Sequence, residues 1–393
     1  MGPLKPANRL SGAPTIAERL SGRDNNFNLI RFIAAAVVLL DHSVALAGTG
    51  ETRLLVLGPL TVDFETFPLG RIAVDVFFVV SGFLVTRSVL TRPTVLDFAV
   101  ARALRLFPAL LAVSFAIAFL LGPLISDKSF AEYFGDLKAW IYGPLTGFLV
   151  SHSLPLPGVF ETVPEEKGIV NSPLWTLRYE AICYGILAVL ALLGALLDRR
   201  IVYALAGLLA AYLLVTFATD LRGHIAAVDS LARFGLSFFL GGAFFVFADR
   251  IRLNWIWMVG LAVVALATST TAIAEFTFRL ALAYGVLWAA LVPGGFIRGF
   301  NRLGDYSYGL YILCWPIQQT VVTLIPTIAA PALFAISFPI TLGLAALSWH
   351  LVEHPALKRK DATSRRAAVL MASGRERLET WRANRRKARR LAS

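Results

Sequence analysis

The chain is poor in charged residues and has almost no cysteine. Only 16% of its 393 residues are charged, whereas soluble domains carry about 25%, and 57% are hydrophobic, with a mean hydropathy of +0.68. Its two cysteines, Cys183 and Cys314, both fall inside apolar runs, which excludes a disulfide framework. These shortages exclude a soluble globular domain and indicate a polytopic membrane protein.

The N-terminus also lacks the pattern of a cleaved signal peptide. Residues 1–26 are polar and mildly basic, without an apolar segment before a small-residue cleavage site, so we expect the first apolar run to be the first membrane anchor. The net charge is +12, but residues 358–393 hold 13 Lys or Arg against 3 Asp or Glu. The positive-inside rule explains a basic tail after a last membrane span, so no nucleic-acid partner is expected.

Long apolar runs predict about ten transmembrane helices. They lie roughly at 28–47, 71–90, 104–122, 174–197, 201–219, 231–248, 254–271, 277–292, 306–325 and 332–352. Arginine clusters recur on every second connection, and an even number of spans places them on the same side as both termini. The sequence therefore predicts an all-α polytopic membrane helical bundle, multi-pass in the inner (plasma) membrane, with both termini cytoplasmic.

This pattern divides the chain into three parts. They are a cytoplasmic N-terminal segment at 1–27, the membrane domain at 28–355 and a basic cytoplasmic tail at 356–393. Within the membrane domain, residues 123–172 form a long extracytoplasmic loop, and loops of this length are usually functional or disordered. The loop is either a surface connector with a short helix near Tyr133–Leu149 or a lid over an outward-facing acceptor site. His152, in this loop, is interpreted as a surface histidine.

The first predicted span carries three ionisable residues, Arg31, Asp41 and His42. Each costs at least about 2.5 kcal/mol in the hydrocarbon, so their presence indicates a function. At about 100° per residue, the helix makes three turns plus roughly 20° between Arg31 and His42, and it rises by about 16 Å. They therefore share one helix face, with Arg31 near one membrane surface and His42 in the interior. Asp41 points about 100° away from His42.

Asp75 is predicted at a depth similar to that of His42. It lies about one turn into the second span, which runs antiparallel to the first, and a carboxylate there can fix the tautomer of an imidazole and raise its basicity. A helix salt bridge between Asp75 and Arg71 is the alternative. The adjacent Ser81-Gly82 pair is interpreted as a close-packing site between helices rather than as a nucleophile.

Glu180 is the second candidate carboxylate. It lies about 10 Å into the fourth span, and a buried glutamate in a bundle marks a functional site by default. A structural ion pair with Arg31, Arg178 or Arg233 is the competing account.

Arg102 and Arg105 lie in the predicted cytoplasmic segment between the second and third spans. Because they are three residues apart, they share a face of a helix at the membrane surface. Guanidinium forks suit phosphate oxygens, which makes the pair a candidate phosphate site. Orientation of the chain by the positive-inside rule is the alternative function.

Taken together, these blocks resemble the acyltransferase-3 family of integral membrane acyltransferases, from Asn26 to Pro355. The matching blocks are Arg31-X10-His42, VDVFFVVSGFL at 74–84, Arg102-X-X-Arg105, LWTLRYE at 174–180 and SYGLY at 307–311. The resemblance implies transfer of an acyl group, most often acetyl, from cytoplasmic acyl-CoA to a hydroxyl of an envelope or exported glycan or a lipid-linked saccharide, beside membrane lipids. It further implies that His42 is catalytic and that Arg31, Arg102 and Arg105 bind the donor; no metal is expected.

One position departs from the family pattern. Family members commonly carry a histidine in the block after SYxxY, where this chain has Cys314, which we interpret as a small packing residue. We expect His42, oriented by Asp75 or Glu180, to act as a general base or as a transient acyl carrier. The alternative is a proton-coupled transporter or flippase without covalent chemistry, since such proteins also use intramembrane charges.

Overall fold

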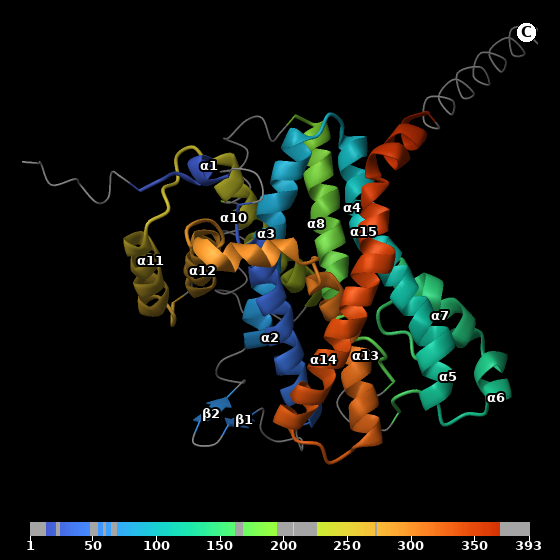
Figure 1. The fold of residues 1–393 in the computed structure, drawn as a ribbon. Helices are drawn as coiled ribbons and strands as arrows, with labels where there is room; N and C mark the ends of the chain where they lie inside the picture. The colour runs from blue at the N-terminus through green and yellow to red at the C-terminus, as the bar shows by residue number, and fades with distance from the viewer. Residues whose placement is uncertain are drawn as a thin grey trace, which may run out of the picture.

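The computed structural model describes residues 13–20, 24–47, 54–57, 60–63, 69–161, 168–194, 207, 226–271 and 273–369. Long helices dominate this part of the chain, and most run along a common direction (Figure 1). The prediction of an all-α polytopic membrane bundle is confirmed, because seven of the described helical segments are long and apolar enough to cross a bilayer. The predicted span at 201–219, apart from Gly207, and the tail beyond residue 369 lie outside the described residues.

Each of the other predicted spans corresponds to a helix. The seven candidate spans are α2 (Phe27–Ala47), α3 (Leu69–Thr91), α4 (Val95–Ala116) with its extension to Ile125, α8 (Leu174–Leu192), α10 (Ala226–Val246), α12 (Ala274–Leu291) and α14 (Ala330–Ser348) with its extension to Lys358. Two further helices are α11 (Trp255–Ala267), which is apolar but shorter, and α13 (Ser307–Leu324), which carries the buried Gln318 and Gln319.

Short elements connect these helices. They are α1 (Ile16–Arg19), an antiparallel hairpin of β1 (Leu54–Leu57) and β2 (Leu60–Asp63), α5 (Gly122–Ile125), α6 (Phe130–Gly135), α7 (Leu137–Gly147), a 3₁₀ segment at Gly295–Arg302 and α15 (His354–Lys358). In the hairpin, Leu54 is opposite Asp63 and Leu57 is opposite Leu60. Helix α7 lies in the region of the long loop where a short helix is expected, and Figure 1 shows α5, α6 and α7 grouped at one side of the bundle.

Helix α4 begins earlier than the sequence predicts. Thr94 caps its N-terminus by accepting a hydrogen bond from the Asp97 amide at 3.1 Å, so the helix starts nine residues before the predicted boundary at 104. Arg102 and Arg105 consequently lie inside a helix that packs in the bundle, instead of in a surface segment before it. At its other end, a π-helical turn at Ile117–Leu121 extends the helix into α5.

Glycines bring α3 and α10 into close contact. A Cβ atom on Gly82 would overlap the backbone of Phe238, and one on Gly241 would overlap the backbone of Val79. Small residues of this kind allow helix backbones to approach closely in membranes. The two helices run parallel, because Asp75 of α3 contacts Ser237 of α10 near one end and Thr86 contacts Gly242 near the other. The interpretation of Gly82 as a close-packing residue is confirmed.

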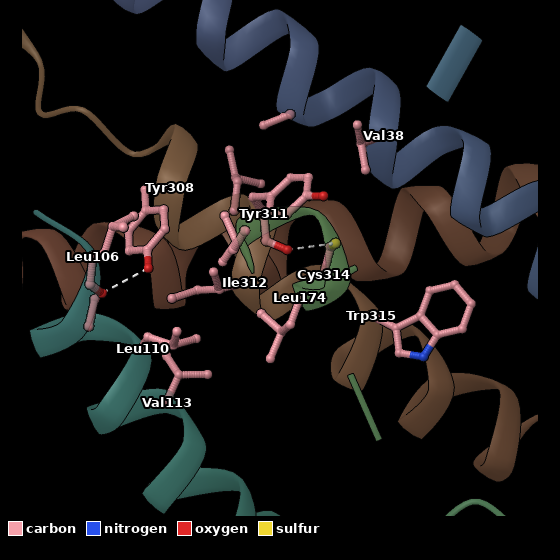
Figure 2. Packing of buried hydrophobic residues seen from close by; sticks show 14 of the residues in the cluster. Val38, Leu106, Leu110, Val113, Leu174, Tyr308, Tyr311, Ile312, Cys314 and Trp315 are labelled. Atoms are coloured by element: carbon pink, nitrogen blue, oxygen red, sulfur yellow. Dashed lines mark hydrogen bonds between the residues drawn. The ribbon is translucent and has the colours of Figure 1, made fainter. Parts of the chain in front are cut away.

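Helix α13 occupies the centre of the bundle, and most of its side chains are buried. Figure 2 shows its residues between α2 and α4, with the Tyr308 hydroxyl donating to the Leu106 carbonyl oxygen at 2.8 Å. Helix α13 runs parallel to α2, since Asp305, just before α13, pairs with Arg31 near the start of α2, and Gln318 Nε2 donates to the Leu39 carbonyl oxygen at 2.7 Å and to Ser43 Oγ at 2.6 Å. This packing fixes the position of α2, which carries the first candidate site residues.

Candidate active site

A cavity of about 80 Å³ lies between α2, α3, α4, α8 and α13. Its polar lining residues are Arg31, Ser81, Arg102, Arg105, Thr176, Glu180, Tyr184, Tyr308 and Tyr311. Four of the six residues predicted to form the site therefore meet around one cavity, although they come from three different helices. We call it the donor cavity, because its three arginines are the residues predicted to bind the donor. Its volume holds several water molecules.

An ion-pair network holds two of the three arginines in place. Arg31 pairs with Asp305, and Arg105 donates to the same Asp305 Oδ2 at 2.6 Å and to Glu353 Oε2 at 3.3 Å. The Tyr308 ring lies 5.5 Å from the Arg105 guanidinium and gives it a cation–π contact. Glu353 lies in a π-helical turn, a distortion that is frequent at functional sites.

Asp305 connects these arginines and was not identified from the sequence. It precedes α13, and Ser307 Oγ donates to its Oδ1 at 2.6 Å. Burial alone would raise the pKa of this carboxyl, but the guanidinium groups of Arg105 and Arg31 hold the pKa at about 2. Asp305 is therefore a permanent anion at neutral pH. The one sequence feature that points to it is its position two residues before the SYGLY block.

Arg102 has a different environment from Arg31 and Arg105. Its guanidinium lies 5.9 Å from the centre of the Tyr184 ring, and its Nε has no hydrogen-bond partner among the described residues. No ion pair joins Arg102 to a described carboxylate. The Tyr184 hydroxyl is a hydrogen-bond partner of this guanidinium, and a guanidinium without an ion pair can still pair with an anionic group of a ligand.

Glu180 accepts hydrogen bonds from two hydroxyl groups in the donor cavity. Ser81 Oγ donates to Glu180 Oε1 at 2.7 Å, and the Tyr184 hydroxyl donates to the same oxygen at 2.5 Å. The competing account of a structural ion pair is not supported within the described part of the chain, and Arg178 instead donates to the Val150 carbonyl oxygen at 3.0 Å. Ser81 is thus part of the polar lining, a role that its interpretation as a packing residue missed.

His42 lies at the other end of α2 from Arg31. Its ring meets Trp315 of α13 edge to face, with ring centroids 4.8 Å apart and planes at 86°. His42 is not among the described residues that line the donor cavity. The cavity reaches Tyr311, however, and Trp315 follows Tyr311 by about one turn of α13. Arg31, which pairs with Asp305 just before α13, and His42, which meets Trp315, therefore lie on the same side of α2, as their shared helix face predicts.

The described contacts of Asp75 are to α10 and α12, and its role in orienting His42 stays a prediction. Asp75 is buried, and its partners in the described residues are Arg233 at 3.2 Å, Arg279 at 3.8 Å and Ser237 Oγ at 3.1 Å. The partners come from α10 and α12, which enclose this face of α3. The alternative salt bridge to Arg71 is not formed either, because only the backbone of Arg71 takes part, through its carbonyl oxygen, which accepts from Arg233.

Cys314 is completely buried, and its thiol lies 3.3 Å from the Tyr311 carbonyl oxygen (Figure 2). This environment agrees with the interpretation of Cys314 as a packing residue. A search of the described residues finds no group of three His, Cys, Asp or Glu side chains placed to hold a metal ion.

Comparison with known proteins decides the family. A family model for an acyltransferase domain matches residues 24–350. The chain belongs to the acyltransferase-3 family. Similar proteins include an O-acetyl transferase of Shigella phage Sf6, 29% identical over 352 residues that cover 86% of this chain and 98% of the phage protein. Nodulation protein 10 of Rhizobium leguminosarum bv. viciae is 27% identical over 392 residues, covering 90% of this chain and 98% of that protein.

No solved structure matches the chain. Membership in the acyltransferase-3 family confirms the predicted enzyme class, and together with the phage relative it supports O-acyl transfer as the reaction. The multi-pass membrane location follows from the same family and from the apolar helices.

Proposed function

We propose that this acyltransferase transfers an acetyl group from cytoplasmic acetyl-CoA to a hydroxyl group of an envelope or exported glycan, in the inner membrane. The observation that carries the proposal is the donor cavity, where the predicted donor-binding residues Arg31, Arg102 and Arg105 meet beside Glu180. The cavity lies toward the end of α2 that carries Arg31, and the positive-inside rule assigns this end to the cytoplasm. The phage relative that is named an O-acetyl transferase supports acetyl as the transferred group.

The donor cavity has too little volume for the nucleotide of CoA. We therefore place the phosphates of the donor at the cytoplasmic surface and the pantetheine arm in the cavity, with the thioester reaching along α13 toward His42. The Arg102 guanidinium forms no ion pair with a described carboxylate, so it can donate hydrogen bonds to an anionic or carbonyl oxygen of the donor. Asp305 holds Arg31 and Arg105 with fixed orientation, so these two arginines shape the entrance without being free to move.

His42 acts at the far end of this path. Tyr308, Tyr311 and Trp315 follow one another along α13 over about 10 Å, leading from the arginines to the His42 ring. In the base route, an imidazole nitrogen takes the proton of the acceptor hydroxyl group while the hydroxyl oxygen attacks the thioester carbonyl carbon. The carbon–sulfur bond then breaks, and the CoA thiolate takes the proton from the imidazolium.

In the second route, His42 carries the acetyl group transiently. The imidazole nitrogen attacks the thioester, CoA leaves as the thiol, and the acceptor hydroxyl then displaces the imidazole from the acetyl carbon. Both routes give the same products, and both require His42. In either route we propose that Glu180 helps to position the donor. It accepts hydrogen bonds from the hydroxyl groups of Ser81 and Tyr184 and so holds both groups in the donor cavity.

The experiment that tests this proposal measures release of CoA thiol from acetyl-CoA by the purified protein, with and without a glycan acceptor. We expect release that depends on both His42 and Arg102, and transfer of labelled acetyl to the glycan. Absence of thiol release with every acceptor tested would contradict the proposal and would favour transport without covalent chemistry.

A further inference from the structure

The carboxamide of Gln319 is the first of two buried polar groups on α13 that no step of the proposed mechanism uses. Gln319 is fully buried, yet neither its Nε2 nor its Oε1 has a hydrogen-bond partner among the described residues. Each of the other buried amide side chains in the described part of the chain forms at least one hydrogen bond; these are Asn26, Asn171, Asn254 and Gln318. A buried amide without any partner is unusual in a folded protein, and a catalytic role is one of its recognised explanations.

The second group is the indole N–H of Trp315, one turn before Gln319. Trp315 is 3% exposed, and its Nε1 has no hydrogen-bond partner among the described residues, although a buried tryptophan usually finds one for this donor. Residues four apart lie on one face of a helix, with Cβ atoms about 5–6 Å apart. The two N–H groups therefore share one face of α13.

This face of α13 meets the turn of α2 that carries His42. The His42 ring contacts the Trp315 ring edge to face, with centroids 4.8 Å apart. One turn farther along α13, Gln318 Nε2 donates to the Leu39 carbonyl oxygen and to Ser43 Oγ, which lie on either side of His42 in the sequence. The turn of α13 from Trp315 to Gln319 thus packs against the turn of α2 from Leu39 to Ser43.

The other side-chain amides of this region hold the fold together. Pro316 has no N–H, so the carbonyl oxygen of Ile312 lacks its usual helix partner, and Asn171 Nδ2 donates to it instead at 2.9 Å. Gln318 joins α13 to α2. The nitrogens of Asn171 and Gln318 therefore serve the structure, whereas those of Trp315 and Gln319 have no described partner.

Acyl transfer places a negative charge in this region. When the acceptor oxygen, or the imidazole nitrogen in the second route, attacks the thioester carbon, the π electron pair of the carbonyl group moves to its oxygen. That pair re-forms the C=O bond as the carbon–sulfur bond breaks, and the leaving thiolate takes a proton from the imidazole ring. The cation of α2, Arg31, lies about 16 Å along the helix from His42, so uncharged donors must stabilise the oxyanion.

We propose that Trp315 and Gln319 form the oxyanion site, with the indole N–H and one carboxamide N–H donating to the carbonyl oxygen of the acetyl group. A carbonyl oxygen has two lone pairs and accepts both hydrogen bonds. Fixed donors of this kind act most strongly in a site without bulk water, where charge develops in the transition state. The inference rests on the acyl transfer by His42 proposed above.

Infrared spectroscopy of the full-length protein measures these hydrogen bonds directly. The probe is an isotope-labelled ketone analogue of acetyl-CoA, in which a methylene group replaces the sulfur, so that the carbonyl group stays and no thiolate can leave. We expect its carbonyl stretching frequency to fall on binding to the wild type, and to return toward the free value in Trp315→Phe and in Gln319→Leu. The same frequency in the wild type and both variants would overturn the proposal.

Steady-state kinetics measures the contribution of the two donors to the reaction. Removal of one oxyanion donor costs about 10²–10³ in kcat. We expect Trp315→Phe and Gln319→Leu each to lower kcat for acetyl transfer about 100-fold with little change in the KM for acetyl-CoA, because the charge exists only in the transition state. A raised KM at unchanged kcat would refute the oxyanion site, since the two groups would then only bind the donor.

Unfolding midpoints separate this role from a packing role. Gln318→Leu, the matched control, removes two hydrogen bonds to α2 and should lower the midpoint. Gln319→Leu removes a buried amide that has no described partner, and an apolar side chain of similar size relieves the cost of burying it. Its midpoint should therefore equal or exceed that of the wild type. A midpoint lowered as far as that of Gln318→Leu would mean that Gln319 serves the fold, against the proposal.

Thiol release distinguishes this inference from the proposed function. Failure of the wild type to release CoA thiol from acetyl-CoA would overturn the proposed function, while a carbonyl shift that Trp315→Phe and Gln319→Leu abolish would leave the site for the donor carbonyl standing. Transfer by the wild type with unchanged kcat in both variants would overturn the oxyanion site and leave the proposed function standing.

Discussion

Asp305→Asn is the substitution for which the structure makes the most quantitative prediction. It removes the negative charge that Arg31 and Arg105 share, while Glu353 remains 3.3 Å from Arg105. Removing one partner of a buried ion pair costs about 3–5 kcal/mol, because the remaining charge stays in the interior unpaired. The side chains of Arg31, Arg105 and Asp305 are 19%, 11% and 13% exposed. We therefore expect the free energy of unfolding to fall by the lower limit of this range, about 3 kcal/mol.

Asp24→Asn is the matched control. Asp24 also pairs with an arginine, Arg298, but its side chain is 62% exposed. Exposed ion pairs contribute about 0–1 kcal/mol, so this variant should unfold nearly as the wild type does. Thermal unfolding of both variants in the same detergent measures the difference. A midpoint for Asp305→Asn equal to that of Asp24→Asn would refute the assignment of Asp305 as the residue that holds the two arginines.

The pH dependence of this effect follows from the sign of the pKa shift. The pKa of Asp305 is lowered to about 2, below the value of about 3.9 for an unfolded aspartate. Its contribution to stability is therefore fully present above pH 4 and is lost as the pH falls through 2. From pH 5 to pH 8, the unfolding midpoint of Asp305→Asn should stay below that of the wild type. A difference that disappears within this range would contradict the low pKa.

Three further substitutions test other parts of the account. Arg102→Gln should raise the KM for acetyl-CoA about tenfold with little change in the unfolding midpoint, because Arg102 has no described carboxylate partner; steady-state kinetics measures this. Glu180→Gln should lower kcat about tenfold at an unchanged unfolding midpoint, since it weakens hydrogen bonds of roughly 1.5–3 kcal/mol to the donor-cavity hydroxyl groups; unchanged kcat would contradict this role. Gly82→Ala should destabilise the protein by about 1–3 kcal/mol through overlap with Phe238, whereas Gly185→Ala, which meets no atom within 4 Å, should not.

The sequence predicted the features that depend on local periodicity. Apolar runs located the helices, and the spacing of Arg31 and His42 placed both on the face of α2 that meets α13 and the residues just before it. Arg102 and Arg105, three residues apart, both line the donor cavity together with Glu180. These predictions succeeded because helix geometry alone fixes which residues share a face.

Partners from distant helices were not predictable in the same way. Arg105 and Asp305 are 200 residues apart, and Asp75 and Arg233 are 158 apart, so no spacing rule relates them. Depth in the membrane predicts Asp75 near His42, but spacing does not fix the rotation of α3, which turns Asp75 toward α10. The start of α4 differs from the prediction because the predicted spans follow apolar runs, whereas in the structure Asp305 and Glu353 neutralise Arg105 within the longer helix.

The central claim is that His42 performs acyl transfer from a donor held beside Arg31, Arg102 and Arg105. The most direct measurement is transfer of labelled acetyl from acetyl-CoA to a glycan by His42→Ala, compared with His152→Ala, a histidine in the loop outside the membrane helices. The account predicts that His42→Ala folds and loses transfer by at least about 100-fold, the contribution of general acid–base catalysis, while His152→Ala retains it. Transfer by a folded His42→Ala protein at the rate of the wild type would contradict the account.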